Sequence, residues 1–170
     1  LLMTCSKLYI IPRTDLASMT SGRAIAQCAH AANQFTRNVM DNRDKIAETI
    51  AFENYHYSAL NWHKEGDGFG TTIVVESGIK FKQDEFFDLM IEEYKKTIPY
   101  IHAGIIVDPT YPIKDGNTVH YISIVTCAYV YVPDYAIRQV ENYEETEWEK
   151  IYSELSSLDL YGPKSSVSVS

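Results

Sequence analysis

Residues 19–35 read MTSGRAIAQCAHAANQF, and this stretch decides the fold prediction. Alanine and other small residues dominate it, which favours a helix that can approach neighbouring strands closely. At about 100° per residue, Arg23, Gln27 and His30 fall on one stripe of such a helix. We therefore predict a helix over about 21–40 that packs on a sheet through its alanines and carries one polar stripe.

The start of this helix has the features of an anion site. Thr20 or Ser21 is expected to cap it, and the first backbone N–H groups, including those of Ser21 and Gly22, lie at the positive end of the helix dipole. Arg23 adds a permanent cation suited to phosphate or carboxylate. The alternative is that the whole stripe is the solvated face of an amphipathic helix. The residues alone leave both interpretations open.

The other sequence patterns predict an α/β protein. β-branched runs indicate strands, and apolar residues at helical spacing indicate helices. The order predicts a single-domain α/β/α sandwich with a mixed sheet of about four strands, plus an added C-terminal helix. The expected segments are strands at 7–13, 71–77, 100–108 and 118–132, helices at 43–61 and 82–97, and an acidic helix from Pro133 to about Leu158.

Acidic residues are concentrated near one end of the chain. The formal net charge is −8, and residues 133–160 hold eight acidic against two basic residues. The net charge argues against a general nucleic-acid binder, yet the nearly neutral remainder can carry a local phosphate-binding patch. We predict a main domain at 1–132, an acidic helical extension at 133–160 and a flexible tail at 161–170.

The composition argues against a cysteine metal site, a membrane span and a signal peptide. Cys5, Cys28 and Cys127 lack metal-ligand spacing, so we expect reduced thiols and no metal site. No apolar run approaches the length of a membrane span, and the start lacks the basic leader and cleavage site of a signal peptide. These features predict a cytoplasmic protein with no membrane partner and no cofactor.

Asp108 is the expected partner of the polar stripe. It ends the run IHAGIIVD and precedes PTYP. In open α/β sheets, ligands bind beyond the carboxyl ends of strands, where a carboxylate can orient His30 or hold a water molecule. The alternative is an ordinary turn-forming aspartate before Pro109.

Residues 10–35, IIPRTDLASMTSGRAIAQCAHAANQF, resemble the N-terminal signature of the type-2 (archaeal and eukaryotic type) peptidyl-tRNA hydrolases. In that family, a strand ending in Arg-Thr-Asp-Leu leads to Met, Gly, a basic residue and Ala-Gln-Cys-x-His-Ala. Trp62, the run TTIVVES at 71–77 and DGNTVHYISI at 115–124 follow in the expected order. The resemblance covers about residues 6–132.

The resemblance implies metal-independent hydrolysis of the ester between a peptide and the 3′ end of tRNA. It also implies peptidyl-tRNA as the partner and a homodimer as the oligomeric state. It assigns four residues to the catalytic site: His30, Gln27, Asp108 and Thr118. We add a set that would bind substrate phosphate: Arg23, Gly22, Ser21 and Arg13.

Three departures from the family pattern support an alternative function. Arg23 replaces a lysine, Ala17-Ser18 stand where another lysine is usual, and DPTYPI replaces Asp-Ala-Gly-Arg-Thr-Gln. Losing these cations would weaken tRNA contacts while leaving the fold intact. The alternative is a catalytically degenerate member of this fold that binds a nucleotide, another small anion or a protein, with DPTYP stacking on a base. The acidic helix would then be a cover over the site, a nucleic-acid mimic or a solvated face.

Overall fold

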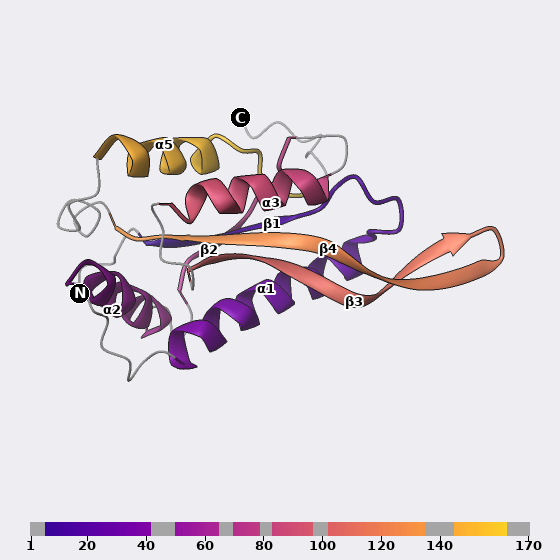
Figure 1. The fold of residues 1–170 in the computed structure, drawn as a ribbon, viewed down its shortest axis with the longest axis horizontal. Helices are drawn as coiled ribbons and strands as arrows, with labels where there is room; N and C mark the ends of the chain where they lie inside the picture. The colour runs from indigo at the N-terminus through magenta and orange to yellow at the C-terminus, as the bar shows by residue number, and fades with distance from the viewer. Residues whose placement is uncertain are drawn as a thin grey trace, which may run out of the picture.

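The computed structural model describes residues 6–41, 50–64, 70–78, 83–96, 102–134 and 145–162. Within these ranges, the chain forms four helices and one four-stranded mixed sheet (Figure 1), which confirms the predicted α/β fold. No helix within these ranges is long and apolar enough to cross a membrane. The elements are β1 (Lys7–Pro12), α1 (Ser21–Asp41), α2 (Ile50–Lys64), β2 (Thr72–Val74), α3 (Gln83–Tyr94), β3 (Ala103–Asp115), β4 (Thr118–Val132) and α5 (Glu145–Ser156).

The sheet has the strand order β2-β1-β4-β3. β1 pairs parallel with β2, while β4 pairs antiparallel with both β1 and β3. Helices α1 and α2 cover one face, and α3 and α5 cover the other (Figure 1). β1 is a continuous apolar run because a central strand in such a sandwich is buried on both faces.

Helix α1 begins where the sequence predicts. The Thr20 Oγ1 atom accepts a hydrogen bond from the Arg23 backbone N–H at 3.4 Å, so Thr20 is the N-cap. Ala24, Ala31 and Phe35 are buried against the sheet. The small side chains on this face allow the close approach that brings the polar stripe up to β3. The next helix, predicted at 43–61, is α2; its expected start lies outside the described residues.

The prediction of a strand ending at Asp108 is wrong. β3 continues to Asp115 and forms a long hairpin with β4, whose arm extends beyond the rest of the sheet (Figure 1). Pro109 is tolerated because β3 is an edge strand, where one missing N–H donor costs little. Gly116, with φ of +60°, makes the tight turn at the tip. DPTYPI is therefore part of a strand rather than a loop.

The acidic helix does not start at Pro133. Pro133 and Asp134 are not helical, and the Asp134 backbone N–H donates to Ser6 Oγ at 2.8 Å. The first helical residue described after this point is Glu145, since 135–144 lie outside the described residues. The helix α5 lies on the face opposite to α1 (Figure 1), so its described part does not cover the α1 side of the sheet. The hypothesis that the acidic helix covers the site is therefore wrong for α5, Glu145–Ser156.

Candidate active site

Three side chains from α1, β3 and β4 form a hydrogen-bonded network. Gln27 Nε2 donates to Asp108 Oδ2 at 2.8 Å, and Thr126 Oγ1 donates to Gln27 Oε1 at 2.6 Å. Gln27 is 4% exposed and Thr126 is fully buried. Because the carboxamide of Gln27 is held at both ends, it fixes the orientation of the Asp108 carboxylate. The structure thus brings together two of the four predicted catalytic residues and adds Thr126.

Two irregularities in the pairing of β3 with β4 orient the side chains of Asp108 and Thr126. The pairing passes from Ile106–Cys127 to Val107–Val125, which leaves Thr126 as an extra residue on β4. A second shift follows Asp108, where Pro109 and Thr110 of β3 stand opposite the single residue Ser123 of β4. Bulges of this kind redirect side chains and are frequent beside active sites. Asp108 lies between the two bulges, and the first one turns Thr126 toward Gln27.

The Asp108 carboxylate is held in its ionised form. Partial burial by itself would raise its pKa, but hydrogen bonds from the Thr110 backbone N–H at 2.9 Å and from Gln27, with a smaller contribution from nearby His30, lower the pKa below its usual value. Asp108 is therefore a weak base and a fixed negative charge at neutral pH. Such a group is better suited to orienting a water molecule or stabilising a cation than to accepting a proton itself.

His30 and Asp108 line the same pocket. Its volume is about 390 Å³, and it lies between α1 and the edge of β3. The His30 side chain is exposed in this pocket, as predicted from the polar stripe, and Gln27 is the buried member of that stripe. The residues that line the pocket are His30, Asn33, Gln34, Arg37, Ile105, Ile106, Val107, Asp108 and Pro109.

A second pocket lies at the N-terminus of α1. It has a volume of about 530 Å³ and is lined by two cations, Arg23 and Lys114, among other residues. One guanidinium nitrogen of Arg23 donates to the Ser18 backbone oxygen at 2.7 Å, which holds the side chain against the loop. Gly22 borders open space, since a Cβ atom there would meet nothing within 4 Å. Of the predicted anion site, Arg23 therefore lines this pocket together with Lys114 and the acidic Asp15, whereas Ser21 and Gly22 are exposed and do not line it.

Arg13 is placed differently from the other predicted phosphate ligands. It is 4% exposed, and its guanidinium binds both carboxylate oxygens of Asp15 and the Val125 backbone oxygen. The hydrogen bonds that Arg13 donates to Asp15 outweigh burial and raise the pKa of Arg13. Asp15 in turn accepts the backbone N–H of Gln83 at 3.2 Å, at the start of α3. Arg13 thus links the end of β1 to Asp15 and to Val125 of β4. It does not line the pocket at the N-terminus of α1.

Thr118 is not brought to the Gln27–Asp108–Thr126 network. It pairs with Asp115 at the tip of the hairpin, whereas Asp108 pairs with Ile124. The six residues between Thr118 and Ile124 correspond to roughly 20 Å along the strand. Thr126 supplies the hydroxyl that contacts Gln27 in its place.

Tyr111 cannot stack on a base in this structure. Its side chain is 1% exposed, and Ser18 Oγ donates to its hydroxyl at 3.1 Å. The hydroxyl also lies 3.8 Å from Met19 Sδ. The expectation of an aromatic platform in DPTYP is wrong, because the second bulge turns this tyrosine inward to anchor the loop before α1.

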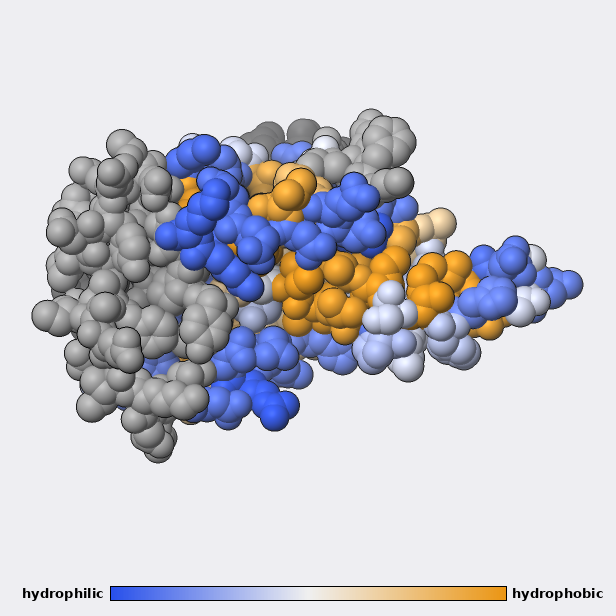
Figure 2. Space-filling view, in the orientation of Figure 1, coloured by the Kyte–Doolittle hydropathy of each residue, from blue (hydrophilic) through white to orange (hydrophobic). Residues whose placement is uncertain are grey.

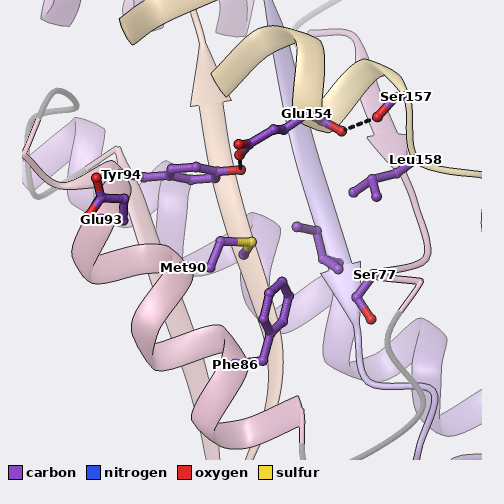
Figure 3. Close-up of a pocket in the computed structure, with 9 residues that line it drawn as sticks. Ser77, Phe86, Met90, Glu93, Tyr94, Glu154, Ser157 and Leu158 are labelled. Atoms are coloured by element: carbon purple, nitrogen blue, oxygen red, sulfur yellow. Dashed lines mark hydrogen bonds between the residues drawn. The ribbon is translucent and has the colours of Figure 1, made fainter. Parts of the chain in front are cut away.

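A third pocket lies on the opposite face of the sheet, between α3 and α5 (Figure 3). Its floor is apolar, with Phe86, Met90 and Leu158 lining a volume of about 390 Å³. At its rim, the Tyr94 hydroxyl donates to Glu154 Oε2 at 2.7 Å, and burial together with this bond raises the pKa of Tyr94. This contact helps attach α5 to the domain.

Two residues of the α1 side were missed by sequence reasoning. No sequence pattern predicted that Thr126 would contact Gln27, because the alternation of side chains along a strand does not show where a bulge occurs. Lys114 did leave one: the Asp-Gly pair at 115–116 is a strong hairpin signal, which would have placed Lys114 on a hairpin arm. Within the described residues, no group of three or more His, Cys, Asp or Glu side chains could hold a metal ion.

The fold and site define an α/β domain with an ordered carboxylate and an exposed imidazole in one groove, next to a cationic helix N-terminus. Residues 6–77 match the family model "Peptidyl-tRNA hydrolase PTH2", which confirms the resemblance over this part of the chain. The matched part contains Arg23, Gln27 and His30, while Asp108 and Thr126 follow it. A comparison with curated proteins found no match.

Proposed function

We propose that this protein is a peptidyl-tRNA hydrolase, which uses water to cleave the ester between a peptide and the terminal ribose of tRNA. The observation that carries the proposal is the Gln27–Asp108–Thr126 network, which presents an ionised carboxylate in the same groove as His30. The match of residues 6–77 to the peptidyl-tRNA hydrolase family supports the same reaction class.

In the proposed reaction, His30 takes a proton from water as the water oxygen attacks the ester carbonyl carbon. The tetrahedral intermediate then breaks its bond to the ribose oxygen, which receives the proton from His30. The products are a peptide carboxylic acid, which ionises in solution, and tRNA with a free ribose hydroxyl. Asp108 stabilises the imidazolium form of His30, and Gln27 is a positioning residue that acts through Asp108.

The tRNA end of the substrate is assigned to the pocket at the start of α1. Arg23 and Lys114 would contact backbone phosphates farther from the ester along the tRNA end, with help from the backbone N–H groups of Ser21 and Gly22. Lys114 would offset, in part, the cations missing from DPTYPI. A cytoplasmic location and a homodimer remain predictions.

Hydrolysis of an N-acetyl-aminoacyl-tRNA tests the proposal. The unmodified protein should release the acyl group, and Asp108→Asn and His30→Ala should each lower the rate by about 100-fold or more. Asp115→Asn is the matched control, because Asp115 lies on the same strand at the exposed hairpin tip.

A well-folded protein with no turnover would contradict the hydrolase proposal and favour the alternative of a binding protein. That alternative has lost its main structural argument, because Tyr111 is buried. Equal loss of activity in Asp115→Asn and Asp108→Asn would also contradict the assigned site.

A further inference from the structure

The two edges of the sheet differ in what covers them. At the β2 edge, the segment after α5 pairs with the strand end: the Glu76 N–H donates to the Asp159 oxygen and the Tyr161 N–H to the Val74 oxygen, both at 2.9 Å. At the other edge, β3 is the last strand, and none of the described residues pairs with its outer side over Ala103–Val107. An uncovered edge of this kind offers alternating N–H and C=O groups to another extended chain.

The open edge of β3 is one wall of the pocket that contains His30 and Asp108. The other wall is a stripe of α1 with the spacing i, i+3, i+4 and i+7, which places its members on one helix face. Hydrogen-bonding side chains line this wall. Its members are His30, Asn33, Gln34 and Arg37.

The surroundings of the groove suit a peptide of any sequence. On the side of the molecule seen in Figure 2, an apolar area lies between the hydrophilic surfaces of α3 and α1. Val107, on the open edge, is 49% exposed. An added strand would place alternate side chains on opposite faces, and this environment offers generic apolar contact without a shaped side-chain pocket.

The groove has a direction. Ile105 to Pro109 span about 13 Å, which is the length of three to four extended residues. Asp108 and the Gln27 contact lie toward one end, and Arg37 lies toward the other, since α1 and β3 run in opposite directions here. Beyond the Asp108 end, the same helix and strand continue to Arg23 and Lys114.

We propose that the peptide part of the substrate binds as an added strand on the outer edge of β3, parallel to β3. Its esterified C-terminal residue lies at Asp108 and His30, and its N-terminal residues extend toward Ile105 and Arg37. This inference rests on the proposed hydrolase function. The opposite direction would place the ester away from the carboxylate and the tRNA away from the cations.

Main-chain pairing would allow one site to bind peptides of different sequence and would favour a peptide over a single amino acid. The hydrogen bonds of an added strand involve only backbone groups, so they do not depend on side-chain identity. A free aminoacyl group is too short to form them and carries its ammonium into the groove. The groove length predicts that the benefit of added residues stops after three to four.

The first test is a series of N-acetylated oligoalanyl-tRNAs with one to six residues, assayed with the full chain. We expect kcat/KM to rise by about tenfold or more from one to four residues and then to level off. The second test places single N-methyl groups along the tetrapeptide. Methylation at alternate residues should lower kcat/KM about three- to tenfold, while methylation at the residues between them should change it little.

The outcomes separate this inference from the proposed function. No hydrolysis of any substrate would overturn both, whereas hydrolysis without length dependence or without the alternation would overturn only the added strand. A dimer that persists with saturating tetrapeptidyl amide, and that Val107→Lys dissociates, would assign the edge to a second copy of this chain and overturn the inference.

Discussion

The two edges of the sheet have opposite roles in this molecule. The β2 edge is closed by the segment that follows α5, and on the same face as α5 an apolar pocket lies between α5 and α3 (Figure 3). The β3 edge has no strand partner among the described residues, contains two bulges and faces the polar stripe of α1. From this contrast we expect the side of the sheet with α5 to determine stability and the β3 edge to determine activity, so that substitutions at the two places should separate these properties.

The largest effect is expected from the closed half. Leu155 of α5 is fully buried against the sheet, so Leu155→Ala should lower the free energy of unfolding by about 2–5 kcal/mol. Thermal or denaturant unfolding measures this loss. The hydrolysis rate per folded molecule should not change, because α5 lies on the face opposite to α1. A rate that rises instead would restore the idea that the acidic helix covers the site.

A substitution at Thr126 should have a smaller effect on stability than Leu155→Ala, but it should lower the hydrolysis rate. Thr126→Val removes the hydroxyl that donates to Gln27, so Asp108 loses its fixed orientation and kcat should fall about tenfold or more. The buried Gln27 oxygen left without this donor should cost about 1–3 kcal/mol of stability. Thr126→Ser keeps the hydroxyl and is the matched control. If the valine and serine variants hydrolyse substrate equally fast, Thr126 is not a positioning residue.

The pH dependence of stability should arise away from the groove. Burial lowers the pKa of His56, His63 and His102 below the ordinary value of about 6.5. The unfolded chain then binds protons that the folded chain does not, so stability is full above about pH 6.5 and falls as pH drops below it. Unfolding temperatures at several pH values measure this effect. His102→Gln should flatten the dependence.

The smallest effect is expected at the anion site. Arg23→Ala should raise KM for peptidyl-tRNA several-fold and make it less sensitive to salt, because one phosphate contact is lost. Arg23→Lys keeps the charge and should stay close to the unmodified protein. Lys64→Ala is the control, as this exposed lysine lies at the end of α2. An equal change in the Lys64 variant would mean that only overall charge is being measured.

Much of the fold was readable because it depends on local patterns. The alanine-rich run predicted α1, and the apolar run at 7–13 predicted the central strand β1. The stripe of Arg23, Gln27 and His30 followed from helical geometry alone. The mixed sheet followed from the order of these segments, since each apolar face needs a neighbouring layer.

The errors occur where the backbone departs from regular spacing. Pro109 suggested the end of a strand, but an edge strand with a bulge passes through it. That bulge buries Tyr111 and places Asp108 within β3 rather than at its end. Thr118 matched a family motif by position, although the β3–β4 pairing places it at the hairpin tip, far from Gln27.

The layers of this protein, the polar stripe of α1 and the cation at the start of that helix follow from the amino-acid sequence, because each depends on residues a few positions apart. The tertiary structure is needed to see which carboxylate and hydroxyl contact Gln27, that Lys114 lines the same pocket as Arg23, and that β3 has no outer partner among the described residues. These depend on strand register, and a single extra residue in a ladder changes which side chains face the helix.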